Sequence, residues 1–124
     1  MMIHLLSVAL GGAMGAMARY WLSGWLNSAD QKLPVGTLTA NVVGSLLMGV
    51  LFVLVMERAK FPPEMRPLLM TGFLGAFTTF STFSLETVTL INEGHVTAAI
   101  FYVLLSVVLS VAALSAAIWF TRLL

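Results

Sequence analysis

A run of hydroxyl and aromatic side chains near the middle of the chain has the most distinctive chemistry. Residues 72–86 read GFLGAFTTFSTFSLE, with two glycines, five hydroxyl side chains separated only by phenylalanines, and a carboxylate at Glu86. The run lies inside an apolar segment long enough to cross a membrane. Within hydrocarbon, backbone that is not helical must be buried in protein or line a watery cavity. The run therefore predicts a polar path or an ion site.

A second polar stripe surrounds Asn41. Thr37 and Ser45 lie four residues to either side of it, so the three side chains share one face of a helix. An asparagine in a membrane helix is often no more than a hydrogen-bonding contact between helices. Three polar residues on one face favour a face that contacts water.

A third stripe lies near the C-terminus, where Tyr102, Ser106 and Ser110 recur every four residues. Isolated serines in membrane helices often bond only to the carbonyl of the preceding turn. Three hydroxyls in register, opposite another hydroxyl-rich helix, predict a pore lining.

Composition and length indicate which elements carry these residues. The chain has 124 residues, of which 60% are hydrophobic and 9% charged, and its mean hydropathy is +1.01. A hydrocarbon core of about 30 Å needs about 20 apolar residues per helix. We therefore expect an all-α membrane protein of one domain, with a third helix interrupted near Gly72 and Gly75. The four transmembrane helices are predicted over residues 3–26, 36–56, 67–91 and 97–121.

Several function classes are excluded by what the chain lacks. A formal net charge of +1 without a basic run argues against a nucleic-acid partner. The chain has no cysteine, which removes disulfide and thiol chemistry. His95 has no second histidine or carboxylate at a spacing that would share a metal ion. The serines within the spans have no positioned His or Lys base, so we do not expect an enzyme.

The first helix carries a close-packing face and one unusual charge. Arg19 lies well inside the span, and it must reach the interface, find an acidic partner or face water. Small residues allow helices to approach closely. We expect them to pack helices and to mediate self-association of the chain, at Gly11 and Gly15 on the first helix and at Gly44, Ser45 and Gly49 on the second.

The distribution of charge predicts a modest orientation bias. An even number of spans brings both termini to one side of the membrane. That side collects Arg58, Lys60, Arg66 and Arg122, whereas Asp30 and Lys32 lie in the short polar connection over residues 27–34. The positive-inside rule then favours cytoplasmic termini, with a bias small enough that insertion in both orientations stays open.

Three stretches of the chain resemble the Fluc (CrcB-type) fluoride channels. They are Gly11-Gly12 through Gly15, Arg19 and Tyr20; Gly36-Thr37-Leu38 through Asn41 and Gly44; and Gly75 through Glu86, with the core TTFSTF. The resemblance covers essentially the whole chain. It implies an antiparallel, dual-topology homodimer of four-helix subunits, with two fluoride pores and a structural sodium ion at the dimer axis.

The resemblance also implies roles for individual residues. The pore phenylalanines fall on Phe80 and Phe83, whose ring edges carry partial positive charge and can coordinate a small anion. Arg19 is implied near the vestibule and Glu86 in a polar network, while the backbone carbonyls of Gly75 and Thr78 are implied to hold sodium. The implied fluoride pathway comprises Phe80, Phe83, Asn41, Thr37, Ser81, Thr82, Tyr102, Ser106 and Ser110.

The function implied is a passive channel in the plasma (inner) membrane of a prokaryote, which exports fluoride from the cytoplasm and gives fluoride resistance. Two alternatives remain open at this point. A small proton-coupled multidrug antiporter has a similar size, although it needs a carboxylate on its first helix and residues 3–26 contain none. A non-transporting assembly subunit would explain the small-residue faces but not three polar stripes.

Overall fold

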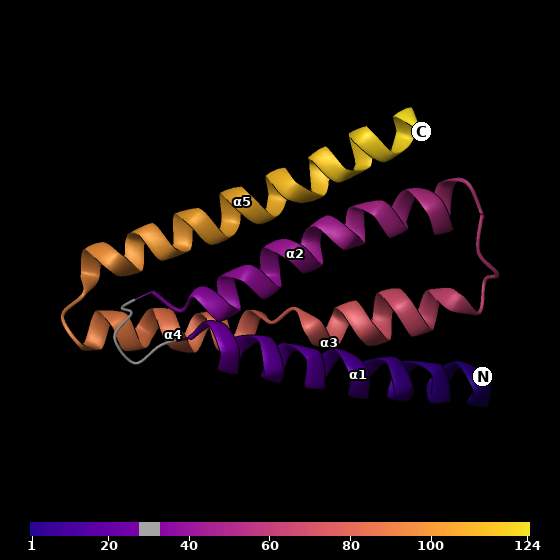
Figure 1. Cartoon of the computed structure of the whole chain (residues 1–124). Helices are drawn as coiled ribbons and strands as arrows, with labels where there is room; N and C mark the ends of the chain where they lie inside the picture. The colour runs from indigo at the N-terminus through magenta and orange to yellow at the C-terminus, as the bar shows by residue number, and fades with distance from the viewer. Residues whose placement is uncertain (28–32) are drawn as a thin grey trace.

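Long helices lie side by side in the computed structural model, which describes residues 1–27 and 33–124 (Figure 1). Asp30 and Lys32, predicted in the first connection, fall outside the described residues. The described part contains helices and turns and no strand. Its elements are α1 (Met2–Leu26), α2 (Val35–Leu51), the π-helical η1 (Phe52–Glu57), the π-helical η2 (Pro67–Leu74), α3 (Gly75–Phe77), α4 (Phe80–Asn92) and α5 (Val96–Leu123).

These elements form four helical spans that are long and apolar enough to cross a membrane, which confirms the expected all-α membrane architecture. The second span joins α2 to η1, and the third joins η2, α3 and α4. Their bounds are Met2–Leu26, Val35–Glu57, Pro67–Asn92 and Val96–Leu123. The observed bounds differ from the predicted ranges by at most two residues.

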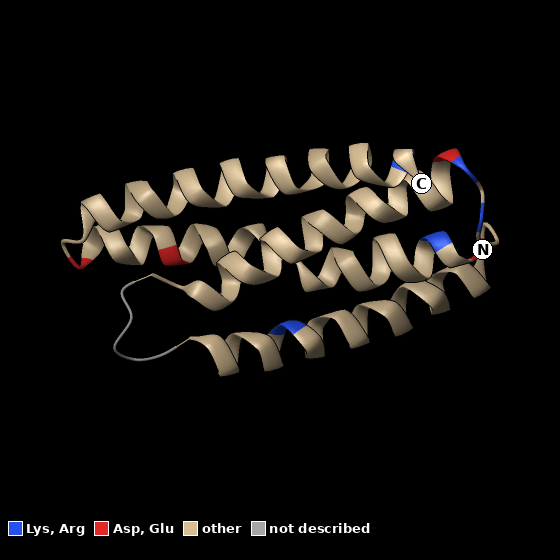
Figure 2. Cartoon of the chain, turned by 45° about the horizontal axis from the view of Figure 1, so that its top comes forward, with Lys and Arg blue, Asp and Glu red and all other residues tan. Residues whose placement is uncertain are grey.

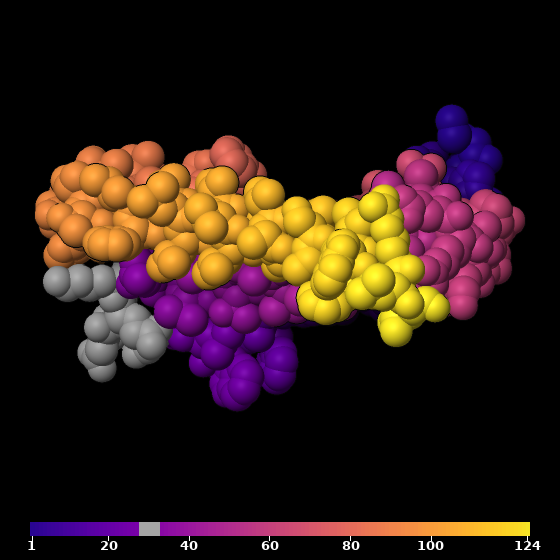
Figure 3. Space-filling model, turned by 90° about the horizontal axis from the view of Figure 1, so that it is seen from above, coloured from indigo at the N-terminus to yellow at the C-terminus, as the bar shows by residue number. Residues whose placement is uncertain are grey.

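The spans pack mainly as two pairs. α1 packs against η2 and α3, and α2 packs against α5, while α4 contacts the first half of α5. α5 runs along the whole of one face, with large apolar side chains exposed on its outer side (Figure 3). Exposed apolar surface of this extent is what a lipid-facing helix presents. Both termini lie at the end that also holds the connection between η1 and η2, as the even number of spans predicts (Figure 1).

The glycines on α1 and α2 allow helices of the same chain to approach closely. A Cβ added at Gly11 would lie 2.2 Å from the Leu68 carbonyl oxygen, and one at Gly15 would lie 2.1 Å from that of Phe73. On α2, a Cβ at Gly49 would lie 2.6 Å from a carbonyl oxygen of α5. The expected helix packing is therefore confirmed at these three glycines, within one chain, and self-association of the chain stays a prediction. The sequence shows a small-residue face but not which helix covers it.

The third span is broken, as expected, but not at its glycines. Gly75 has helical dihedral angles of φ −60° and ψ −33°. The chain becomes extended at Thr78 (φ −90°, ψ 156°) and Thr79 (φ −153°, ψ 126°). Gly72 serves close packing instead, since a Cβ there would lie 2.9 Å from the Val8 carbonyl oxygen of α1. The break is thus three residues beyond the predicted position.

Most of the charged residues that the structure describes lie at the ends of the spans (Figure 2). The exceptions are Arg19 on α1 and Glu86 on α4, which are both partly buried. The described ion pair joins Arg122 to Glu57, at the end where α5 and η1 finish. Charges inside a membrane span usually mark function, so the two exceptions point to the region around the break.

Candidate functional site

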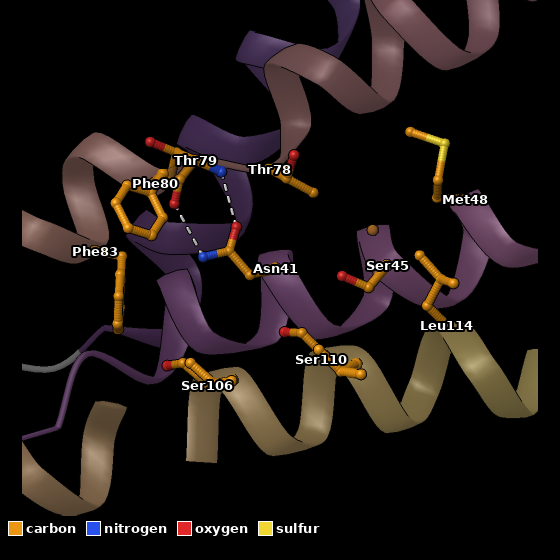
Figure 4. Close-up of a pocket in the computed structure, with 13 residues that line it drawn as sticks. Asn41, Ser45, Met48, Thr78, Thr79, Phe80, Phe83, Ser106, Ser110 and Leu114 are labelled. Atoms are coloured by element: carbon orange, nitrogen blue, oxygen red, sulfur yellow. Dashed lines mark hydrogen bonds between the residues drawn. The ribbon is translucent and has the colours of Figure 1, made fainter. Parts of the chain in front are cut away.

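The break in the third span is held by a side chain from the second. Asn41 on α2 faces the extended backbone of Thr79 (Figure 4). The Thr79 N–H donates to Asn41 Oδ1 at 2.7 Å, and Asn41 Nδ2 donates to the Thr79 carbonyl oxygen at 3.0 Å. Backbone polar groups away from water need partners. The amide therefore replaces the acceptor that the Thr79 N–H loses at the break, and it adds a donor to a carbonyl that, as the N-cap of α4, already begins the next helix.

Thr79 also caps the start of α4. Its Oγ1 accepts a hydrogen bond from the Thr82 N–H at 3.2 Å, which is a side-chain N-cap. The sequence analysis did not single out Thr79 as a site residue. Its N-cap preference was the available signal, because threonine is favoured directly ahead of a helix.

The carbonyls of Gly75 and Thr78 are among those that lose their helical donors at the break. In a continuous helix the N–H of Thr79 would donate to the Gly75 carbonyl, and the N–H of Thr82 to the Thr78 carbonyl. Here those N–H groups donate to Asn41 and to the Thr79 hydroxyl. Gly75 is exposed and Thr78 is half-buried. Both carbonyls expected to bind sodium are thus released from helical hydrogen bonding.

Arg19 reaches the break from α1. Its Nε donates to the carbonyl oxygen of Ala76 at 3.0 Å. Ala76 lies in the short α3, where the helix ends and carbonyls lack helical donors. A cation also interacts favourably with the negative end of a helix dipole. Arg19 therefore donates to a backbone carbonyl at the break. The sequence had predicted the interface, an acidic partner or water instead.

A cavity of about 360 Å³ opens beside the break (Figure 4). Residues of α2, of the break, of α4 and of α5 form its walls. None of its lining residues carries a charge. Its polar lining consists of Asn41, Ser45, Thr78, Thr79, Ser106 and Ser110, and its apolar lining includes Phe80 and Phe83.

The two predicted pore phenylalanines line this cavity and contact each other. Their ring centroids are 5.6 Å apart, with the ring planes tilted by 56°. Phe80 is 78% exposed, whereas Phe83 is 9% exposed and its ring lies 5.2 Å from that of Tyr102. Tilted rings direct an edge toward a neighbouring group. Phe83 is therefore held in the cavity wall by its neighbours, while Phe80 is exposed on the surface of the chain.

Ser106 and Ser110 line the cavity from α5. The Ser106 hydroxyl is buried and has no hydrogen-bond partner among the described residues. A buried hydroxyl without a partner is uncommon, because losing its contact with water costs free energy. This hydroxyl is therefore available to a polar species inside the cavity.

The remaining polar residues form a second group around Glu86. Thr37 Oγ1 donates to Glu86 Oε2 at 3.1 Å, and the Tyr102 hydroxyl donates to Glu86 Oε1 at 3.1 Å. Thr37 and Tyr102 are both buried, and the three residues come from α2, α4 and α5. The carboxylate thus joins three helices through hydroxyl groups and has no basic partner among the described residues.

The structure divides the predicted pathway residues into three groups. The cavity holds Asn41, Phe80, Phe83, Ser106 and Ser110. The carboxylate group holds Thr37 and Tyr102. Ser81 and Thr82 line neither, because the first turn of α4 directs Ser81 outward and turns Thr82 toward the Thr79 hydroxyl, at 3.2 Å.

The amino-acid sequence is similar to those of known ion channels. Residues 6–118 match the family described as CrcB-like protein, Camphor Resistance (CrcB). The fluoride-specific ion channel FluC of Saccharophagus degradans is 54% identical over 118 residues, which cover 94% of this chain and 88% of that protein. FluC of Hahella chejuensis is 50% identical over 122 residues, which cover 98% of this chain and 96% of that protein. The chain therefore belongs to the CrcB family, whose matched region contains the break, the cavity and the carboxylate group.

Proposed function

We propose that the protein is a passive, fluoride-selective channel that lets fluoride leave the cytoplasm down its electrochemical gradient and so gives fluoride resistance. The observation that carries this proposal is an uncharged cavity with phenylalanine, hydroxyl and amide walls beside a broken span. The relatives named as fluoride-specific ion channels support the choice of ion. An inside-negative potential favours export, since one charge crossing 100 mV gains about 2.3 kcal/mol.

The lining groups can replace part of the ion's hydration shell. The Asn41 amide has two N–H groups, and one of them already donates to Thr79. The other N–H and the Ser106 hydroxyl can donate to fluoride, while Ser110 continues the polar wall one turn further along α5. Several weak sites in series let an ion enter and leave.

The phenylalanine edges suit a small anion because they attract it without a fixed cation that would trap it. Phe80 and Phe83 supply such edges from successive turns of α4. Arg19, which could act as a fixed cation, donates to the Ala76 carbonyl instead of lining the cavity. Fluoride would therefore pass along neutral cavity-lining groups, which bind it only weakly.

A sodium ion at the break is part of the proposal. The carbonyls of Gly75 and Thr78 fit such an ion, because both have lost their helical N–H donors and sodium prefers oxygen ligands. A bound cation would neutralise acceptors that hydrocarbon leaves unpaired. Its role would be structural.

An antiparallel homodimer with dual topology would complete the surroundings of the break. In a single subunit, Gly75 and Phe80 are exposed, although Gly75 carries a released carbonyl. Lipid cannot pair with such a carbonyl, whereas a second subunit or an ion at the shared axis can. We expect the dimer in the inner membrane of a prokaryote, with two pores.

Flux from liposomes tests the proposal. Vesicles that contain the purified protein should release fluoride rapidly and retain chloride, whereas protein-free vesicles should retain both. Equal release of the two halides would refute selectivity. Release of a lipophilic cation driven by a proton gradient, without fluoride release, would instead indicate the multidrug antiporter.

A further inference from the structure

A second cavity, of about 700 Å³, lies at the end of the molecule that holds both termini. The start of α1, the end of η1, the loop that follows η1 and the start of η2 line it. Basic and apolar side chains share its walls, namely His4, Lys60 and Arg66 with Val55, Met56 and Phe61. A cavity of this size far exceeds what a single halide ion needs.

The lining of this cavity is basic. No carboxylate lines it, and the loop residue Glu64 is not among its walls. The ion pair found within the described residues joins Arg122 to Glu57, so neither Lys60 nor Arg66 has an acidic partner there. A concave surface lined by positive charges attracts an anion. Arg66 can in addition donate two parallel hydrogen bonds to a phosphate group.

The loop that forms the cavity has a restricted conformation. Pro62, Pro63 and Pro67 fix three backbone angles around it. Ala59 adopts a left-handed φ of 47°, and the Lys60 N–H donates to the Leu54 carbonyl at 2.8 Å. A loop held in this way loses little conformational freedom when a ligand binds.

The depth of the cavity indicates the source of the anion. It lies between the end of the second span at Glu57 and the start of the third at Pro67, which is the level of lipid headgroups. Met56 is 42% exposed and Phe61 36% exposed, so the apolar part of the wall continues to the surface of the chain. We propose that this cavity binds the phosphate headgroup of an anionic phospholipid, with Lys60 and Arg66 on the phosphate and Met56 and Phe61 against the start of the acyl chains.

Native mass spectrometry of the full chain in detergent tests this site and does not depend on the proposed channel function. The protein is titrated with phosphatidylglycerol or with phosphatidylcholine of the same acyl chains. We expect phosphatidylglycerol to bind more tightly, and Lys60→Gln and Arg66→Gln each to weaken that binding about five-fold. Arg58→Gln is the matched control, because it removes one charge from the same loop without touching the cavity.

Each possible result decides the proposal. The proposal is supported if Lys60→Gln and Arg66→Gln lose the preference for phosphatidylglycerol over phosphatidylcholine. Arg58→Gln and Lys60→Arg should both bind phosphatidylglycerol as the wild type does. Unchanged binding in both cavity variants overturns it, and so does an equal loss in Arg58→Gln, which would indicate diffuse charge. Displacement of the lipid by an equal concentration of inorganic phosphate would identify a site for free phosphate and would also overturn it.

Discussion

Asn41 and Thr79, which are 38 residues apart in the chain, exchange two hydrogen bonds across the break in the third span. Within hydrocarbon the bond to Asn41 Oδ1 satisfies a backbone N–H that would otherwise have no partner, and the second bond ties the amide to the Thr79 carbonyl. Because the Thr79 N–H donates to Asn41, it no longer donates to the Gly75 carbonyl as it would in a continuous helix. One amide thus both stabilises the break and exposes an oxygen for an ion.

Replacement of Asn41 by alanine should destabilise the protein and abolish fluoride flux. Each buried backbone group left without a partner costs about 1–3 kcal/mol of unfolding free energy. Unfolding in detergent and flux from liposomes would measure the two effects. Ser45→Ala is the control, since Ser45 lines the same cavity one turn along α2. Equal stability of Asn41→Ala and Ser45→Ala would contradict the role given to the amide.

Replacement of Gly15 by alanine should separate α1 from the third span. The new Cβ would lie 2.1 Å from the Phe73 carbonyl oxygen, so backbone must move. Overpacking of this kind costs about 1–3 kcal/mol. Gly24→Ala on the same helix has open space within 4 Å and should leave stability equal or slightly higher. Thermal unfolding of the two variants checks this, and a similar loss in both would mean that helix packing is not the cause.

Replacement of Phe80 or Phe83 by isoleucine should slow fluoride flux about two- to ten-fold, because a ring edge contributes about 0.5–1.5 kcal/mol in favourable contacts. Phe83→Ile should also lower stability, since Phe83 packs on Tyr102, whereas Phe80 is mostly exposed. Phe101→Ile on the outer face of α5 should change neither property. If both cavity variants conduct like the wild type, the rings do not belong to the pathway.

Exchange of sodium for N-methylglucamine at constant ionic strength should lower the unfolding temperature. A ligand present at 100 times its dissociation constant stabilises the folded state by about 2.7 kcal/mol. Thr78→Val should keep this dependence, because the proposed ligand is the Thr78 carbonyl, and its hydroxyl donates to Leu74 at 2.9 Å. An unfolding temperature independent of sodium would remove the ion from the proposal.

The sequence predicted the four spans and located the polar run, but it misplaced the break. Gly72 and Gly75 are the more obvious helix breakers, whereas the helix ends at two threonines. Thr79 can leave the helix here because Asn41 supplies the acceptor that its N–H would otherwise lack, and that contact is long-range. The glycine spacing likewise predicted close helix packing, but only the tertiary structure shows which helix of the chain covers each glycine.

Composition and the lengths of the apolar runs alone determined that this protein is a four-helix membrane protein, because the thickness of hydrocarbon sets the length of a helix that crosses it. The tertiary structure decided how the polar residues divide, with Ser106 beside the cavity and Tyr102 on Glu86 although one turn of α5 separates them. The physical reason is that a polar group in a dry environment takes the partner that lies nearest in space, and neighbours in space come from helices far apart in the chain.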